Sequence, residues 1–285
     1  MLSSLTSAVS GLQAYQEELD VIGNNIANVN TTGFKSSAMD LSDSFSNTLA
    51  SSSLNGGSTE QIGTGVVTSA VETEFTQGAI TTTGVQTNLA ISGSGFFVVK
   101  DPVNGDSYVT RAGDFQLDAN GYLVTAGGLR VQGYNDSALT TVGDIQINGT
   151  NPAPPSTTSS TATMTGYTID ATGKITIDMS DGSEYVGGQI LMQNLTNPQS
   201  LVNVGNSLYS NYGAAGPLGG STTPTPAASG TNGLGQILSG SLEQSNVDLS
   251  TEFSNLIQAE RAFQANARVI TTSDEILQEL DNLKH

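Results

Sequence analysis

Few side chains in this 285-residue chain could act as a nucleophile, a general base or a metal ligand. The chain has no cysteine, and its single histidine is the last residue, His285. These counts exclude thiolate zinc sites, iron–sulfur clusters and a buried imidazole base. Glu17 and Glu18 are adjacent and would point about 100° apart on a helix, so they form no acid–base pair. We therefore predict no catalytic residue, no metal site and no enzymatic activity; a glycosidase built on dispersed carboxylates is left without support.

Two glycine-containing motifs resemble ligand-binding loops only in part. Gly93-Ser94-Gly95 precedes an apolar run, Phe96 to Val99, which predicts a strand, so no helix N-terminus follows to hold a phosphate. The run Asp118-Ala119-Asn120-Gly121 resembles the start of a calcium loop but lacks the downstream glutamate. It has the residues of a tight hairpin turn between Phe115–Leu117 and Tyr122–Val124. We expect no cofactor at either place.

The charge balance limits the partners. Lysine and arginine total 8 against 26 aspartates and glutamates, a formal net charge of −18. Such a chain is repelled by phosphate backbones and anionic lipid surfaces, so we expect no nucleic acid partner and no direct membrane insertion. Apolar runs stay below the roughly 20 residues that span a bilayer. Residues 1–15 also lack the basic region and apolar block of a Sec signal peptide, so any export is expected to use another route.

Both ends of the chain show helical periodicity. Near the N-terminus an apolar residue recurs every three or four positions from Leu5 to Val29. This pattern predicts a helix of about 25 residues, roughly 37 Å long, that ends in the polar run 28–32 and Gly33. Near the C-terminus, apolar residues recur every seven positions from Leu249 to Leu277, which is typical of a coiled coil. Asn246 or Asp248, with Ser250 as a rival, would cap the start of this second helix.

Three asparagines within residues 24–28 lower the helix propensity of the first helix near its end. They can be caps of a fraying helix, or they can donate hydrogen bonds to a neighbouring subunit and fix its register. The residues themselves leave both interpretations open. The same holds for the two helices, which can pair within one monomer or with other chains.

The rest of the chain favours short strands and turns. The sequence predicts an α+β fold, mainly β, with discontinuous terminal helices that form a coiled-coil-like region. We expect terminal helical segments at 1–35 and 240–285, and an extended arm or linker at 36–61. A β-rich central domain at 62–239 follows, with room for a small insertion at 138–163.

Several motifs resemble the flagellar axial proteins of bacteria, the family of rod and hook subunits. At the N-terminus these are Ser7-Ala8-Val9-Ser10-Gly11-Leu12, Asp20 to Asn28 and Gly33-Phe34-Lys35. At the C-terminus they are Ser245 to Ser250, Gln258 to Asn266 and Thr271 to Asp274. In the middle, Gly95-Phe96-Phe97, Thr110-Arg111-Ala112-Gly113 and Leu123-Val124-Thr125 also match, so the resemblance covers both ends and much of the centre.

The resemblance implies a tubular homo-polymer in a bacterial flagellum, with an inner layer of terminal helices and an outer β-rich layer. It also implies export by the flagellar type III apparatus, and contacts with other axial proteins and the hook cap. The sequence of the C-terminal motifs is more similar to hook proteins than to rod proteins, so we expect a hook subunit that transmits torque. The compact layout and the 36–61 arm favour the alternative, a distal rod protein of the basal body. A secreted adhesin or carbohydrate-binding β protein is the alternative from another class.

Under this interpretation one set of residues forms the interface between subunits. Its apolar members make the helical seam, and its asparagines set the register. The expected interface residues are Leu5, Leu12, Leu19, Ile22, Asn24, Asn25, Ile26, Asn28, Leu249, Phe253, Leu256, Phe263, Asn266, Ile270 and Leu277.

Overall fold

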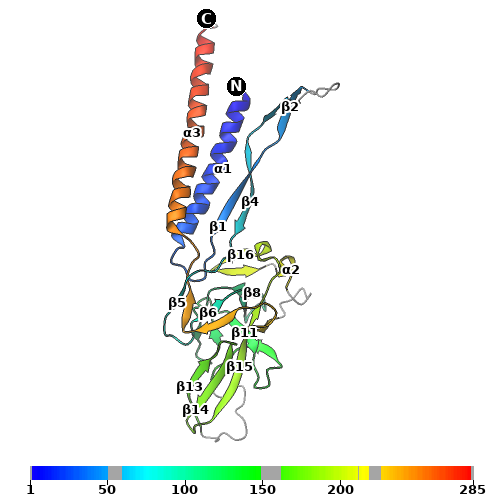
Figure 1. The fold of residues 1–285 in the computed structure, drawn as a ribbon, viewed down its shortest axis with the longest axis vertical. Coiled ribbons are helices and arrows are strands. Elements are labelled where there is room, and N and C mark those ends of the chain that lie inside the picture. The colour runs from blue at the N-terminus through cyan, green and yellow to red at the C-terminus, as the bar shows by residue number, and fades with distance from the viewer. Residues whose placement is uncertain (1, 51–59, 149–161, 211, 218–225, 284–285) are drawn as a thin grey trace. The chain divides into compact units, whose positions relative to one another are not determined.

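A computed structural model describes residues 2–50, 60–148, 162–210, 212–217 and 226–283 of the chain (Figure 1). It confirms the predicted α+β fold, mainly β, with helices at both ends and a β-rich centre. In chain order the elements are α1 (Leu2–Ala27), β1 (Ser37–Asp43), β2 (Ser46–Ala50), β3 (Glu60–Gly63), β4 (Val66–Thr73), β5 (Ile80–Thr82), β6 (Leu89–Ser92), β7 (Phe96–Lys100), β8 (Ser107–Thr110), β9 (Gln116–Leu117), β10 (Leu123–Val124), β11 (Arg130–Tyr134), β12 (Val142–Asp144), β13 (Met164–Ile169), β14 (Lys174–Met179), β15 (Glu184–Gln193), η1 (Pro198–Ser200), β16 (Val202–Gly205), β17 (Leu208–Ser210), α2 (Tyr212–Ala215), β18 (Ala227–Ala228), β19 (Gln236–Ser239), β20 (Ser241–Glu243) and α3 (Leu249–Asn282).

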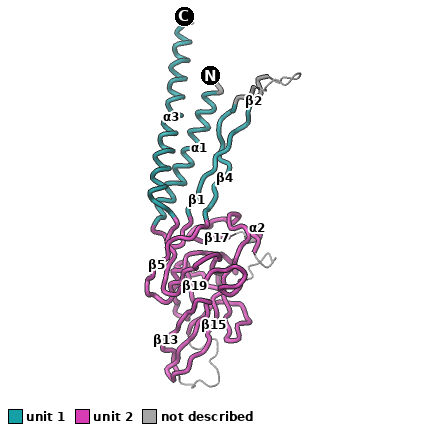
Figure 2. Tube along the Cα trace, viewed as in Figure 1, with its two compact units in different colours: residues 1–29, 36–74, 247–285 teal, residues 30–35, 75–246 magenta. Residues whose placement is uncertain are grey.

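The chain divides into two compact units, and neither is a continuous stretch of sequence (Figure 2). The helical unit comprises residues 1–29, 36–74 and 247–285. The β-rich unit comprises residues 30–35 and 75–246. The arm segment 36–61 thus falls in the same unit as the two terminal helices, and a short N-terminal stretch falls in the β-rich unit.

In the helical unit, α1 and α3 pack side by side and run antiparallel (Figure 1). Asn25, near the end of α1, donates to Glu252 in the first turn of α3. Gly11, in the first half of α1, lies against Asn266, in the second half of α3. Asp248 caps α3, because its carboxylate accepts from the backbone nitrogen of Ser250 at 3.0 Å. This selects one of the three caps that the sequence offered.

The segment predicted as an extended arm or linker forms one side of a long β-hairpin. Strand β1 pairs antiparallel with β4 from Ser37 opposite Thr73 to Asp43 opposite Val66, and β2 pairs with β3. Backbone hydrogen bonds from Ser44 to the carbonyl of Gly65 and from Thr64 to that of Phe45 link the two ladders. Residues 51–59 lie outside the described part of the chain. Strands β1 and β4 both contact α1, so this helix packs against α3 and the hairpin.

The β-rich unit is built on one antiparallel sheet with the strand order β13-β14-β15-β11-β7-β8-β17-β16. Strands β9, β10, β12 and β18 extend this sheet, and β6–β19 and β5–β20 form separate ladders. Central strand β7 is buried on both faces. Because side chains alternate along a strand, its residues enter two different cores. Phe97 and Val99 enter a large core with Leu89 and Ile190, whereas Phe96 and Val98 enter a smaller second core.

The second core is aromatic. The ring of Phe75 meets those of Phe96 and Tyr209 edge to face, with centroids 5.4 and 5.2 Å away. Such pairs add to the stabilisation from apolar burial. Burial also raises the pKa of Tyr209 to about 12.

The turns lie where the sequence predicted them. Strands β9 and β10 form the predicted hairpin, with Gly121 at φ +82°. The carboxylate of Asp118 accepts from the backbone nitrogens of Asn120 and Tyr122, both at 2.8 Å, so it closes the turn. The motif Gly93-Ser94-Gly95 joins β6 to β7 with no helix after it. Of the insertion expected at 138–163, β12 pairs with β11, and residues 149–161 lie outside the described part.

Among the residues described, no helix is long and apolar enough to cross a membrane.

Candidate assembly helices and a buried ion network

The predicted apolar stripe of α1 faces inward. Ile22 is 5% exposed, and Leu5, Leu12, Leu19 and Ile26 are half-buried. The small residues Ala8 and Ala14 are buried among them. Periodicity located this face because the helix has 3.6 residues per turn, and the positions at three- and four-residue spacing form one stripe.

The heptad pattern of α3 describes only the centre of the helix. Leu256, Phe263, Asn266 and Ile270 are half-buried, together with the small buried residues Ala259 and Ser273. In contrast, Leu249, Phe253 and Leu277 are 39%, 51% and 41% exposed. Length explains only the exposure of Leu277, because α3 has 34 residues against 26 in α1 and its C-terminal end extends beyond α1. The start of α3 lies beside α1, where Glu252 contacts Asn25, but Leu249 and Phe253 remain exposed there within a single chain.

A close approach between the helices uses a glycine that hydrophobic periodicity did not identify. A Cβ placed on Gly11 would lie 2.7 Å from Nδ2 of Asn266. The predicted register residue Asn266 thus contacts the backbone of α1 in its own chain. Small residues at helix interfaces allow such contact, and the pattern Ala8, Gly11, Ala14 was the available signal.

The three asparagines near the end of α1 have different roles. Asn25 is 2% exposed: its Nδ2 donates to the carbonyl of Ser37 and to Glu252, and its Oδ1 accepts from the nitrogen of Ser37. Asn28 instead donates to the carbonyl and side chain of Asn24, which satisfies groups at the helix end. Asn25 therefore joins α1, α3 and β1 within one chain, and Asn28 and Asn24 act as local caps.

Carboxylates gather where α1, α3 and β1 meet. Glu18, Glu74 and Glu252 line a shallow cavity of about 220 Å³. Burial raises the pKa of Glu18. Burial also raises the pKa of Glu252, and the nearby charges of Glu74 and Asp248 raise it further, against the hydrogen bond from Asn25. The cluster adds electrostatic repulsion at this junction.

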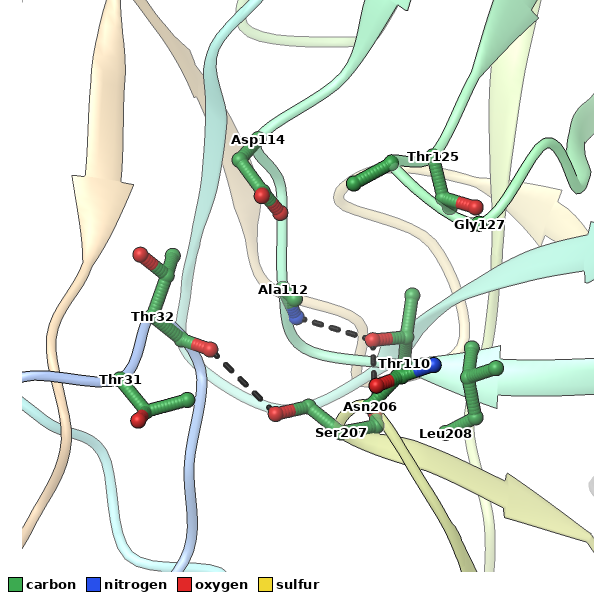
Figure 3. Close-up of a pocket in the computed structure, with 11 residues that line it drawn as sticks. Thr31, Thr32, Thr110, Ala112, Asp114, Thr125, Gly127, Asn206, Ser207 and Leu208 are labelled. Carbon is green, nitrogen blue, oxygen red and sulfur yellow. Dashed lines mark hydrogen bonds between the residues drawn. The ribbon is translucent and has the colours of Figure 1, made fainter. Parts of the chain in front are cut away.

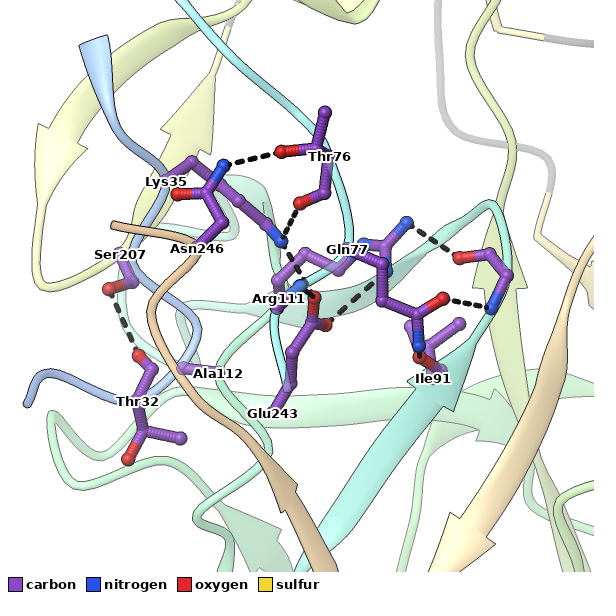
Figure 4. A network of polar contacts seen from close by, with 12 residues as sticks. Thr32, Lys35, Thr76, Gln77, Ile91, Arg111, Ala112, Ser207, Glu243 and Asn246 are labelled. Atoms are coloured by element: carbon purple, nitrogen blue, oxygen red, sulfur yellow. Dashed lines mark hydrogen bonds and ion pairs between the residues drawn. The ribbon is translucent and has the colours of Figure 1, made fainter. Parts of the chain in front are cut away.

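A buried ion network lies in the β-rich unit (Figure 4). The side chains of Lys35 and Glu243 are fully buried, and Nζ of Lys35 lies 2.7 Å from Oε1 of Glu243. Arg111 approaches the other oxygen, with Nη1 3.3 Å from Oε2. The carboxylate also accepts from the backbone nitrogen of Gly78 at 2.9 Å. One acid is thus shared by two cations and a backbone donor.

The surroundings disfavour the charge on both cations. Burial lowers the pKa of Lys35 and of Arg111, and the charge of Glu243 opposes this effect in each case. Nη2 of Arg111 donates to the carbonyl of Gly93 at 2.9 Å, and its guanidinium stands 5.2 Å from the ring centre of Phe96. Its buried Nε has no hydrogen-bond partner among the described residues. No local pattern predicted this network, because its members are spread along the chain.

A cavity of about 360 Å³ lies near this region of the β-rich unit (Figure 3). Four threonines contribute to its lining, and Asp114 supplies a carboxylate. Thr110 donates to the carbonyl of Ser207 at 2.8 Å, and the hydroxyl of Ser207 donates to the carbonyl of Thr32 at 3.4 Å. This lining lacks a nucleophile paired with a base. In the described ranges, no group of three or more acidic or histidine side chains could hold a metal ion.

The described residues form paired terminal helices and a β-rich unit, which is the arrangement expected for a flagellar axial protein. The chain is 39% identical over 289 residues to the flagellar basal-body rod protein FlgG of Bacillus subtilis, an alignment that covers all of both proteins. The chain therefore belongs to the flagellar rod and hook family of bacteria, whose members are structural and not enzymes. The resemblance seen in the sequence motifs is confirmed at this level, and the expectation that the chain is no enzyme is confirmed with it.

Other comparisons agree. Family models match residues 5–35 (flagella basal body rod protein), 90–177 (flagellar hook protein FlgE/F/G D1 domain) and 238–283 (flagellar basal body rod FlgEFG protein C-terminal). The rod protein FlgG of Agrobacterium fabrum is 32% identical over 96% of the chain and 97% of its own length. The hook protein FlgE of Treponema pallidum is 45% identical, but over 47% of the chain and 30% of its own length. The expected alternative of an adhesin has no support among these relatives.

Proposed function

We propose that this chain is the distal rod subunit of the flagellar basal body rather than a hook subunit. The observation that carries the proposal is the end-to-end similarity to basal-body rod proteins in several bacteria. This similarity favours the distal rod protein, which was the alternative in our sequence interpretation, over the hook protein, which was its first choice.

A higher local identity to one hook protein favours the hook interpretation. The Treponema pallidum hook protein reaches 45% identity over 140 residues. The hook protein of Borreliella burgdorferi needs an alignment of 450 positions, against 285 residues here, and is 26% identical. The additional positions indicate segments that this chain does not have. The terminal motifs are thus common to both subunit types, and the overall length favours the rod.

Assembly would use the surfaces of α3 that α1 leaves exposed. Leu249, Phe253 and Leu277 belong to the expected interface, and Ile276 and Leu280 are 51% and 47% exposed beside them. Exposed apolar rows on a helix gain stability when they pack against other helices. We propose that they contact other copies and other axial proteins in a helical tube. The half-buried seam of α1 and α3 would support them from within each subunit.

The proposal also covers how the subunit is exported and where it is assembled. The subunit would be exported through the flagellar type III apparatus and assembled in the basal-body rod, beyond the cytoplasm. The hook cap would be a partner only under the hook interpretation.

Deletion of the gene tests the proposal, with the basal bodies viewed by negative-stain electron microscopy. Under the rod proposal, basal bodies lack the distal rod and carry no hook, and a plasmid copy restores both. Complete rods that lack only the hook would support the hook interpretation instead. Intact flagella would overturn an axial role for this chain.

A further inference from the structure

The carboxylate of Glu243 connects stretches of chain that are far apart in the sequence (Figure 4). Its partners Lys35, Gly78 and Arg111 lie 208, 165 and 132 positions earlier in the chain. Because a buried carboxylate needs hydrogen-bond donors, Glu243 is satisfied only when all these stretches are in place.

Backbone hydrogen bonds connect the same stretches. Gly33 donates to the carbonyl of Glu243 at 2.9 Å, and Gln244 donates to that of Ala79 at 2.8 Å. Lys35 donates in addition to the carbonyl of Thr76 at 2.7 Å. The chain enters or leaves the β-rich unit beside each stretch, after residues 35, 74 and 246. Three stretches of the network therefore lie at the ends of this unit, and Arg111 connects them to its interior.

The charges in the network are not balanced. Two buried cations share one buried anion. Loss of Glu243 would leave both cations without a counter-charge, whereas loss of Lys35 would leave a neutral pair of Arg111 and Glu243. A buried charge without a partner is strongly destabilising, and a neutral pair is much less so. Removal of the Glu243 charge is therefore expected to destabilise the network more than removal of the Lys35 charge.

We propose that Glu243 is a latch that closes the ends of the β-rich unit, stretches 33–35, 76–79 and 243–246, as one cooperative step. Strands such as β14 and β15 close without it, because they pair with each other and contain none of the residues that contact Glu243. The latch cannot close until the chain extends past residue 243. This inference goes beyond the proposed rod function and does not depend on it.

Hydrogen exchange of the full chain, read by mass spectrometry, tests the latch with the variant Glu243→Gln. Glutamine keeps the size of the side chain and removes its charge. We expect exchange about a hundredfold faster in all three stretches together, with unchanged exchange in β14 and β15. Lys35→Met should open the same stretches less, because it leaves a neutral pair.

The matched control is Asp144→Asn, which removes the half-exposed ion pair between Asp144 and Arg130 in the same unit. Exchange in the three stretches should not change in this variant. Unchanged exchange in Glu243→Gln, faster exchange in one stretch alone, or equally faster exchange in β14 and β15 would overturn the latch. An effect of Lys35→Met as large as that of Glu243→Gln would overturn its charge basis. Should Glu243→Gln fail to fold, joint opening of the three stretches in Lys35→Met supports the latch, and its absence overturns it.

Discussion

Gly33 lies directly against the backbone of Ala112, with φ at +65°. A Cβ placed on Gly33 would be 2.4 Å from the nitrogen of Ala112 and 2.7 Å from its Cα. Backbone atoms of a buried loop cannot move aside as a flexible side chain does. We predict that Gly33→Ala destabilises the β-rich unit by about 2 kcal/mol or more, from the left-handed backbone and the overlap together. Urea unfolding followed by tyrosine fluorescence measures this loss.

A variant at Gly84 separates the cost of the left-handed backbone from the cost of the steric overlap. Gly84 has a similar φ of +73°, but a Cβ there would meet nothing within 4 Å. Gly84→Ala should therefore show the backbone contribution alone, about 1 kcal/mol. Equal losses in the two variants would contradict the packing argument at Gly33.

Phe263 tests the seam between α1 and α3. It is half-buried on the inner face of α3, so Phe263→Asp places a charge against α1. We predict a loss of about 3 kcal/mol in the stability of the helical unit, and loss of tube assembly. Circular dichroism and sedimentation measure the two effects.

Gln264, the next residue, is exposed and serves as the control. Gln264→Asp should change stability by less than about 0.5 kcal/mol. Hydrogen exchange in the β-rich unit should be the same in both variants as in the original chain. Normal tubes from Phe263→Asp would disprove the seam.

The parts of the structure that follow from local pattern were predictable. The inner stripe of α1 and the turn at Gly121 depend on residues within one helix or one hairpin. The cap of α3 was narrowed to three residues, of which the structure selects Asp248. The ladder of β1 with β4 was not predictable, because pairing of distant strands leaves little local signal and segment 36–61 is rich in serine.

The candidate site shows the same limit. Heptad spacing identifies Leu256 and Ile270, but it cannot show that α1 is too short to cover Leu277. The pairing of Lys35 with Glu243 depends on the folded chain alone.

Leu277 tests the exposed end of α3. It lies beyond α1 and is 41% exposed, so Leu277→Ser removes little buried area within one chain. We predict a change of less than about 0.5 kcal/mol in monomer stability, together with weaker assembly under the proposed function. Thermal unfolding of the monomer and sedimentation of the polymer measure the two effects. Ile270→Ser, on the half-buried face, should lower both; normal assembly of Leu277→Ser would remove this residue from the interface.

Asp248 gives α3 a dependence on pH. The hydroxyl of Thr251 and the backbone nitrogen of Ser250 donate to its carboxylate, and these bonds hold its pKa below the usual 3.8. Because the pKa is lower in the folded chain, the cap stabilises α3 fully above pH 3.8, and this stabilisation is lost as the pH falls through the folded value.

The variant Asp248→Asn isolates this effect, because asparagine caps a helix about as well as aspartate and does not titrate. Other carboxylates of the chain titrate in both proteins, so their contribution cancels in the difference. We predict similar helicity for the two proteins at neutral pH, and a smaller loss in the variant on acidification, measured by circular dichroism. Asp248→Ala should have lower helicity than Asp248→Asn across the whole range, because alanine offers no acceptor to Ser250. Parallel acid loss in the original chain and in Asp248→Asn would show that the cap carries no pH dependence.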